Sequence, residues 1–122
     1  MKPRKVLIVD DSKLLHRMYE VMLRQVLLLH AYDGKSGLAM LKQNLDVDLV
    51  LLDINMPVMT GLEFLAQARS DEQTKKVAII IVTTEGSEAQ TQRGMDAGAT
   101  AYLTKPFDGT KLLQVITQLE AP

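Results

Sequence analysis

Five side chains with the capacity for chemistry stand at or just after the ends of short apolar runs in this sequence. They are Asp10, Asp11, Asp53, Thr83 and Lys105. Three carboxylates gathered in one place repel each other by roughly 4 kcal/mol per pair at about 4 Å and an effective dielectric of about 20. A divalent cation and a nearby ammonium group would offset that repulsion. A fold that brings these residues together therefore predicts a cation site.

The oxygen-only character of this group indicates which cation it would take. Carboxylate oxygens without histidine or cysteine favour a hard cation. Mg²⁺ fits best because it keeps several waters and needs only one or two carboxylates plus phosphate oxygens. The two histidines are predicted to be irrelevant to the site, since His16 falls within the first predicted helix and His30 near the end of the second predicted strand.

An aspartate placed beside Mg²⁺, a lysine and a threonine has a specific use in phosphoryl transfer. Its carboxylate can attack a phosphoryl group and form an aspartyl phosphate, while the cation and the ammonium neutralise the charge on the equatorial oxygens. A threonine hydroxyl at the neighbouring strand end gains a new partner only when the phosphoryl group is present, which supplies a switch.

Each residue also has a purely structural interpretation. Asp11 or Ser12 could cap the helix that follows. Asp53 and Thr83 could serve as turn or cap residues, and Lys105 could be a solvated surface charge. It is the combination of all of them at the predicted strand ends that favours the functional interpretation.

The elements that would position these residues follow from the apolar pattern. Apolar runs cover residues 6–9, 26–29, 49–52 and 77–82, with a weaker run at 101–103. Runs this short and uniformly apolar suit strands buried on both faces of a parallel sheet. Helical stretches lie between them, and right-handed crossovers place such helices on both sides of the sheet. The sequence therefore predicts an α/β fold whose polar residues meet beyond the carboxyl ends of the strands.

The stretches between the runs show the spacing of amphipathic helices. The predicted core-facing residues are Leu14, Leu15, Met18, Met22, Leu38, Leu41, Leu45, Leu62, Leu65, Ala66, Leu112, Leu113, Ile116 and Leu119. Residues 87–96 are much more polar and include Gly94, which predicts the least stable helix.

Composition excludes several classes of protein. The 122 residues are 47% hydrophobic and 24% charged, which suits one domain with a substantial core. A net charge of −1 argues against binding to nucleic acid or to a membrane surface. The absence of cysteine excludes disulfide scaffolds and thiol catalysis. No apolar run is long enough to span a bilayer and the N-terminus does not resemble a signal peptide, so we expect a soluble, intracellular protein.

Three stretches of the sequence together resemble the receiver domain of two-component response regulators. They are residues 6–12 (VLIVDDS), 51–57 (LLDINMP) with Gly61, and 98–107 (GATAYLTKPF). The resemblance covers essentially the whole chain and points to the single-domain, CheY-like type. It implies a flavodoxin-like, doubly wound (βα)5 fold with a five-stranded parallel sheet of order 2-1-3-4-5. It also implies that residues 1–122 form one receiver domain without an output domain.

The functional positions of that family have counterparts in this chain. The resemblance implies that Asp53 accepts the phosphoryl group. Asp11, Asp53 and the backbone carbonyl of Asn55 would bind Mg²⁺ directly, whereas Asp10 would act through a water molecule. The ammonium group of Lys105 would pair with the phosphoryl group.

The remaining matches concern switching and the lifetime of the signal. Thr83 and Tyr102 resemble the switch pair, in which the tyrosine moves inward when the threonine turns towards phosphate. Asn55 and Glu85 match the pair that tunes the lifetime of the phosphoryl group in chemotaxis regulators, and this pair indicates a short-lived signal. The Lys105–Pro106 peptide bond is expected to be cis, since proline lowers the cost of the cis form.

The function that the resemblance implies is a phosphorylation-dependent signalling switch. The chain would not be an enzyme beyond catalysing its own phosphoryl transfer and dephosphorylation. A sensor histidine kinase would supply the phosphoryl group, and a downstream protein would bind the face made by the fourth helix, the fifth strand and the fifth helix. We expect a cytoplasmic protein of a chemotaxis-like pathway that is a monomer or weak dimer and contacts neither nucleic acid nor a membrane.

Three alternatives remain open at this point. The chain could be a receiver domain excised from a larger response regulator or a hybrid kinase. A Mg²⁺-dependent phosphohydrolase of the haloacid-dehalogenase type would have its nucleophile in an Asp-x-Asp arrangement after the first strand, where this chain has Asp10, Asp11 and Ser12. A flavodoxin-like binding protein would need a phosphate-cradling loop at that place, where the two aspartates would repel phosphate.

One region departs from the family pattern. Between the first predicted helix and Asp33, residues 24–30 contain no glycine and form a shorter connection than the family usually has. The boundary of the second strand and the edge of the sheet are therefore left open. The phosphorylation site does not depend on them.

Overall fold

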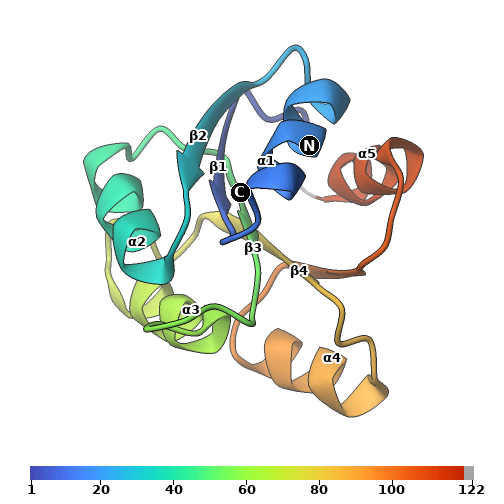
Figure 1. Ribbon diagram of the computed structural model, residues 1–122. Coiled ribbons are helices and arrows are strands. Elements are labelled where there is room, and N and C mark those ends of the chain that lie inside the picture. Colours follow the sequence, from blue (N-terminus) through green and yellow to red (C-terminus); the bar gives the residue numbers. More distant parts are fainter. Residues whose placement is uncertain (120–122) are drawn as a thin grey trace.

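The computed structural model describes residues 1–119, in which five strands alternate with five helices (Figure 1). The strands are β1 (Lys5–Val9), β2 (Leu27–Ala31), β3 (Leu49–Leu52), β4 (Ala78–Thr83) and β5 (Ala101–Thr104). The helices are α1 (Lys13–Met22), α2 (Gly34–Gln43), α3 (Gly61–Ser70), α4 (Glu88–Asp96) and α5 (Gly109–Gln118). The end of the predicted domain, residues 120–122, lies outside the described part of the chain.

The five strands are parallel and form one sheet of order β2-β1-β3-β4-β5. This order confirms the doubly wound α/β fold that the sequence resemblance implies. Helices α1 and α5 cover one face of the sheet, and α2, α3 and α4 cover the other (Figure 1). Within residues 1–119, no helix has the length and apolar character needed to cross a membrane.

The two faces of the sheet hold separate halves of the core. Successive side chains of a strand point to opposite faces. Leu7 and Val9 of β1 therefore pack in the half that includes α2 and α3, whereas Val6 and Ile8 pack in the half that includes α1 and α5. Strands β3 and β4 are buried along their whole length. Apolar burial at roughly 25 cal/mol per Å² holds these central strands in register.

The edge strands differ from the prediction that each apolar run is buried on both faces. Strand β2 begins and ends later than the predicted run 26–29, and Leu27 is 60% exposed. An edge strand has a neighbour on one side only, so its side chains are less covered. Strand β2 still pairs with β1, from Lys5 opposite Leu27 to Val9 opposite Ala31. The short connection before β2 shifts a strand boundary and leaves the strand order intact.

Helix α1 buries only part of the predicted face, since Leu15 is buried and Met22 packs against the core as predicted. Leu15, Tyr19 and Leu23 are buried in the core, whereas Leu14 is 68% exposed and Met18 is 39% exposed. Both sets recur at intervals of about four residues, so each satisfies the spacing of a helix face. The spacing identifies the helix and does not decide which apolar stripe faces the sheet. Further residues predicted to face the core are also exposed, namely Leu45, Ala66 and Leu113.

Each helix begins at a side chain that caps its N-terminus. The side chain of each cap residue accepts a hydrogen bond from a backbone N–H in the first turn. The cap residues are Ser12, Asp33, Thr60, Ser87 and Asp108. Such caps satisfy N–H groups that the start of a helix leaves unpaired. They also fix where each helix leaves its loop, and hence the shape of the loops around the carboxyl end of the sheet.

Gly61 is required where the start of α3 passes close to the end of β3. A Cβ atom at this position would lie 2.5 Å from the carbonyl oxygen of Asp53 and 2.7 Å from the Cα of Ile54. These are backbone atoms, so the clash cannot be relieved without displacing the loop that contains Asp53.

We predict that Gly61→Ala lowers the free energy of unfolding, measured by urea denaturation, by about 2–3 kcal/mol.

Gly109→Ala is the matched control for this prediction. A Cβ atom at Gly109 would meet its nearest heavy atom, the Cγ of Met22, at 3.4 Å, which is an ordinary contact. The control should keep the free energy of unfolding within about 0.5 kcal/mol of the unaltered chain. Equal losses in the two variants would show that close backbone approach is not the reason for the glycine.

Candidate functional site

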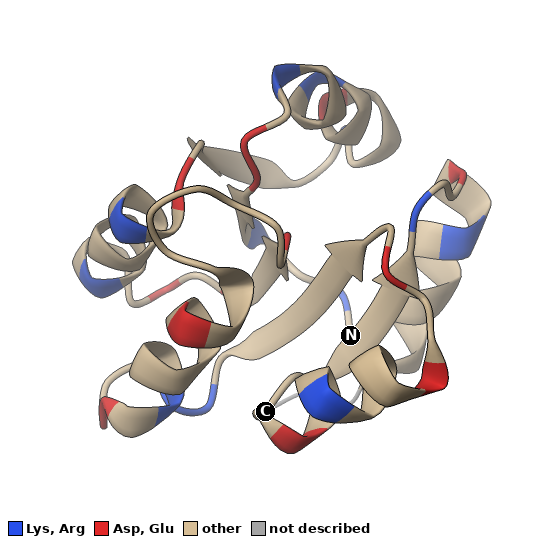
Figure 2. Ribbon diagram, turned by 60° about the horizontal axis from the view of Figure 1, so that its bottom comes forward, with Lys and Arg blue, Asp and Glu red and all other residues tan. Residues whose placement is uncertain are grey.

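Three carboxylates meet at the carboxyl end of the sheet because β1 and β3 are neighbouring strands. The register places Val9 opposite Leu52, so Asp10 and Asp53 leave the two strands side by side. Asp10, Asp11 and Asp53 each offer a carboxylate oxygen, and these oxygens all lie within 4.8 Å of one another. Acidic residues stand in several of the loops that follow the strands (Figure 2). The predicted convergence of the three aspartates is therefore present in the structure.

The ammonium group of Lys105 lies against this acidic cluster. Its Nζ atom is 3.2 Å from Oδ2 of Asp10 and 4.0 Å from Oδ1 of Asp53. The loop after β5 holds the lysine in place, since the Lys105 N–H donates a hydrogen bond of 2.7 Å to the carbonyl of Thr83. The Lys105–Pro106 peptide bond is cis. One positive charge thus faces three negative ones at the rim of the sheet.

Burial and nearby negative charge both reduce the acidity of Asp53, which is only 7% exposed. Burial raises the pKa of Asp53 to about 6, and the negative charge of Asp10 adds to the increase. The charge of Lys105 and a hydrogen bond from the N–H of Asn55 to Asp53, at 3.4 Å, oppose the change. When all three carboxylates are ionised, the single positive charge of Lys105 does not neutralise them.

The donor set of the cluster fits a hard divalent cation. Asp10 and Asp53 are buried whereas Asp11 is exposed, so the cluster opens to solvent on one side. All its ligand atoms are carboxylate oxygens, which are the ligands that Mg²⁺ and Ca²⁺ prefer. A cation at this point would supply the positive charge that Lys105 alone does not.

Glu85 links the acidic cluster to the neighbouring strands. Its carboxylate accepts a hydrogen bond of 3.1 Å from the side-chain amide of Asn55, which lies in the loop after β3. Its backbone N–H donates to Oγ1 of Thr83 at 3.4 Å, and its carbonyl accepts a hydrogen bond from the hydroxyl of Tyr102. Thr83 is fully buried at the end of β4. The four residues predicted for switching and signal lifetime thus form one connected group.

The loop between Asp53 and α3 contains one residue in an unusual backbone conformation. Val58 has a φ angle of 71° and is 88% exposed, and beside it the N–H of Met59 donates to the carbonyl of Pro57 at 2.8 Å. A β-branched residue at positive φ costs of the order of 1–3 kcal/mol. On the inner side of the same loop, Met56 is buried and Met59 packs against the core.

Neither histidine belongs to the acidic cluster, and the structure places His16 beside the backbone of Asp10. Nε2 of His16 lies 2.7 Å from the carbonyl oxygen of Asp10, and Nδ1 of His16 lies 2.7 Å from Nδ1 of His30. His16 comes from α1 and His30 from β2. The pairing is a tertiary contact between elements that no local pattern connects, so the sequence contains no signal for it.

The comparisons with known proteins agree with this geometry. The family model of the response regulator receiver domain matches residues 6–117, and the chain therefore belongs to this family. Among its relatives is the chemotaxis protein CheY-3 of Vibrio cholerae, which is 34% identical over 121 residues, covering 97% of this chain and 92% of CheY-3. The structure is similar to that of the chemotaxis protein CheY4 of Vibrio cholerae, with a TM-score of 0.88 and 37% identity, covering 96% of this chain and 98% of that one.

A receiver-like segment also occurs inside a much longer protein. The sensor histidine kinase CheAY of Helicobacter pylori is 35% identical to this chain over 114 residues, which cover 91% of this chain and 14% of CheAY. The same kind of domain thus occurs both in proteins of this length and as part of a kinase. Membership of the receiver family decides against the phosphohydrolase and the flavodoxin-like binding protein that the sequence left open.

The acidity of Asp53 leads to a prediction about stability. The pKa of Asp53 is about 6 in the folded chain against 3.8 as the ordinary value, so the folded state binds more protons between these two values. The ionised carboxylate therefore lowers stability as pH rises from about 4 to about 6. Without divalent cations, Asp53→Asn should raise the free energy of unfolding at about pH 7.5 by about 1–3 kcal/mol.

Urea denaturation across this pH range checks the prediction. The gain from Asp53→Asn should shrink below about pH 6 and vanish below about pH 3, where the unaltered carboxyl is protonated in both the folded and the unfolded state. Glu72→Gln removes one negative charge from a side chain that is 85% exposed and serves as the control for net charge. A gain that is equally large at every pH, or equal in the two variants, would contradict the assignment.

Proposed function

We propose that this chain is a phosphorylation-dependent signalling switch that accepts a phosphoryl group on Asp53 from a histidine kinase in a Mg²⁺-dependent reaction. The observation that supports it most is the gathering of Asp10, Asp11 and Asp53 within 4.8 Å, with Lys105 4.0 Å from Asp53. A fold selected only for stability has no reason to collect three carboxylates at one buried rim. A site that binds a cation and stabilises a phosphoryl group requires such a collection of carboxylates.

The proposed reaction begins at a carboxylate oxygen of Asp53. This oxygen attacks the phosphorus of a phosphohistidine, so that a P–O bond forms, the P–N bond breaks and the imidazole nitrogen keeps the electron pair. With a pKa of about 6, Asp53 is mostly ionised near neutral pH and ready to attack. Hydrolysis of the aspartyl phosphate later returns the carboxylate and releases inorganic phosphate.

Asp11, Asp53 and the backbone carbonyl of Asn55 are the proposed direct ligands of Mg²⁺, and Asp10 acts through a water molecule. When bound, the cation supplies positive charge to the phosphoryl oxygens in the transition state. Lys105 pairs with a phosphoryl oxygen in the same role, which requires only a short movement from its present partner Asp10 at 3.2 Å. Binding, orientation and charge together account for the proposed chemistry.

The proposed switch uses the group around Glu85. In the structure, Oγ1 of Thr83 accepts a hydrogen bond from the N–H of Glu85. When Asp53 is phosphorylated, the hydroxyl of Thr83 bonds a phosphoryl oxygen instead and releases this N–H. Because Glu85 also holds Tyr102 and Asn55, this exchange changes the partners of both. The hydrogen bond between Asn55 and Glu85 joins the loop after Asp53 to the loop after Thr83, and this pair sets how long the phosphoryl group survives.

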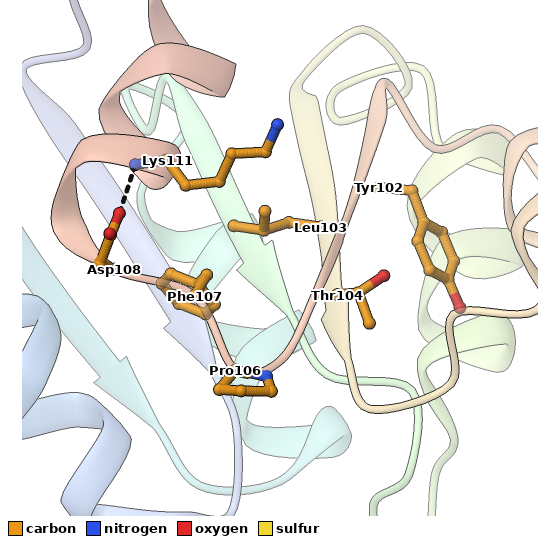
Figure 3. Close-up of a pocket in the computed structure, with 7 residues that line it drawn as sticks. All are labelled: Tyr102, Leu103, Thr104, Pro106, Phe107, Asp108 and Lys111. Carbon is orange, nitrogen blue, oxygen red and sulfur yellow. Dashed lines mark hydrogen bonds between the residues drawn. The ribbon is translucent and has the colours of Figure 1, made fainter.

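The proposed partner surface is the face formed by α4, β5 and α5. It includes a groove of about 520 Å³ whose lining comes from β5, the loop after it and the first turn of α5 (Figure 3). The lining residues are Tyr102, Leu103, Thr104, Pro106, Phe107, Asp108 and Lys111. Since Tyr102 belongs both to this groove and to the group around Glu85, a change at Asp53 reaches the groove through one side chain.

The relatives named CheY favour chemotaxis as the pathway, and the proposed protein acts in the cytoplasm as a monomer or weak dimer. A downstream protein, rather than nucleic acid or a membrane, is the proposed target. This chain matches only 14% of the kinase CheAY. That match supports the alternative in which the same receiver works as one domain of a longer response regulator or hybrid kinase. The chemistry at Asp53 is the same in both settings.

Phosphorylation by a small donor tests the proposal directly. Incubation with Mg²⁺ and acetyl phosphate should add the mass of one phosphoryl group to the intact chain, because Asp53 is the only proposed acceptor. Asp53→Asn should add none, and removal of Mg²⁺ with a chelator should abolish the gain. Glu72→Gln should behave like the unaltered chain. An equal gain in Asp53→Asn, or no gain in the unaltered chain, would remove the proposed function.

The switch predicts a change in dynamics over residues 85–96. Helix α4 buries only Gly94, so few apolar contacts oppose its movement. Addition of Mg²⁺ and beryllofluoride, which imitates the phosphoryl group, should change amide hydrogen exchange in this segment by at least about threefold. Asp53→Asn should show no change under the same conditions. Identical exchange with and without beryllofluoride in the unaltered chain would contradict the switch.

A further inference from the structure

The backbone carbonyl of Asp10 receives its hydrogen bond from a side chain. Asp10 follows the last residue of β1, and its N–H donates to the carbonyl of Ala31 at 3.1 Å as the ladder with β2 continues. In residues 1–119, no backbone N–H outside the helices and strands donates to the Asp10 carbonyl. The Nε2 atom of His16 lies 2.7 Å from this oxygen, and the imidazole is only 2% exposed. His16 therefore satisfies a buried acceptor that belongs to the acidic cluster.

The orientation of the His16 ring is set from its other side. A carbonyl can only accept, so Nε2 of His16 holds the proton and Nδ1 is free to accept from Nδ1–H of His30 at 2.7 Å. Nε2 of His30 in turn lies 3.4 Å from the carboxylate of Glu20. The ring of Tyr32 packs on His16 with centroids 4.3 Å apart. The imidazole is thus held by a chain of contacts that ends at the Asp10 carbonyl.

The position of the Asp11 side chain depends on the contact between His16 and the Asp10 carbonyl more than the position of the Asp10 side chain does. The side chain of Asp10 is held twice, by the N–H of Ser12 at 2.8 Å and by Lys105 at 3.2 Å. The side chain of Asp11 is exposed and, in the described part of the chain, makes no hydrogen bond or ion pair. Its position is set by its own backbone, and the peptide group that leads into it begins at the carbonyl held by His16.

We propose that His16 is a positioning residue for the cation site, acting through the peptide group between Asp10 and Asp11. This inference rests on the proposed function, since both require that the cluster of Asp10, Asp11 and Asp53 binds a cation. Groups that orient the ligands of a metal typically change its affinity by about tenfold or more when they are removed. The pairing of His16 with His30 gives the edge strand β2 a direct connection to the phosphorylation site.

Two substitutions separate positioning from packing. His16→Phe keeps an aromatic ring next to Tyr32 and removes the N–H that reaches Asp10. His16→Gln keeps a side-chain N–H donor. Leu23→Ala, at the other end of α1 and only 4% exposed, lowers stability without touching Asp10 and serves as the control. The free energy of unfolding of each variant is measured alongside, so that loss of fold is not mistaken for loss of positioning.

The first measurement is the dissociation constant of Mg²⁺, from amide shifts of the full chain during a titration. We expect His16→Phe to weaken Mg²⁺ binding by about tenfold, His16→Gln to recover affinity to within about threefold, and Leu23→Ala to bind as the unaltered chain does. Unaltered affinity in His16→Phe would overturn the inference. So would a loss in Leu23→Ala that equals the loss in His16→Phe.

The second measurement needs no cation and keeps the two proposals distinguishable. Amide hydrogen exchange at Ser12, whose N–H donates to Oδ1 of Asp10, should be at least about fivefold faster in His16→Phe than in the unaltered chain, because the loop has lost its anchor. Equal exchange would overturn the positioning role. Absence of Mg²⁺ binding by the unaltered chain would remove the proposed function, while the exchange measurement still decides the role of His16.

Discussion

Repulsion among Asp10, Asp11 and Asp53 is the physical constraint around which this structure is arranged. The register of β1 and β3 forces these carboxylates to within 4.8 Å, and the buried strands around them keep the register from relaxing. Lys105 offsets part of the repulsion, and burial together with the charge of Asp10 still raises the pKa of Asp53 to about 6. The apolar core thus holds charged groups in an arrangement that is unfavourable until positive charge arrives.

The polar contacts around the cluster connect it to neighbouring elements of the fold. Glu85 bonds Asn55 with its carboxylate, Thr83 with its N–H and Tyr102 with its carbonyl. A change of partner at Thr83 therefore passes to two other elements through one residue. Because Tyr102 lies in the groove beside α5, the route from the rim of the sheet to this groove is short. On the opposite side, the His16–His30 pair connects the same rim to β2.

Much of the fold could be predicted from local patterns, and the errors have a common cause. Short apolar runs mark β3 and the other strands to within a few residues, and polar caps such as Ser12 mark where helices begin. The face of α1 was predicted only in part, because Leu14 and Leu15 belong to two stripes of equal spacing and only the stripe of Leu15 is buried. The positive φ of Val58 is invisible for a related reason, since the loop around it imposes a conformation that valine itself disfavours.

The amino-acid sequence alone determined the fold class, the family and the identity of the acidic residues, because these depend on residue types at fixed local spacings. It also placed Asp53 and Lys105 at one rim, since parallel strands bring their carboxyl ends together whatever the exact packing. Only the tertiary structure decided that His16 reaches the Asp10 carbonyl and that β2 lies partly exposed at an edge. Such contacts arise from how a helix is rotated against a sheet, and that rotation is fixed by the packing of the whole core.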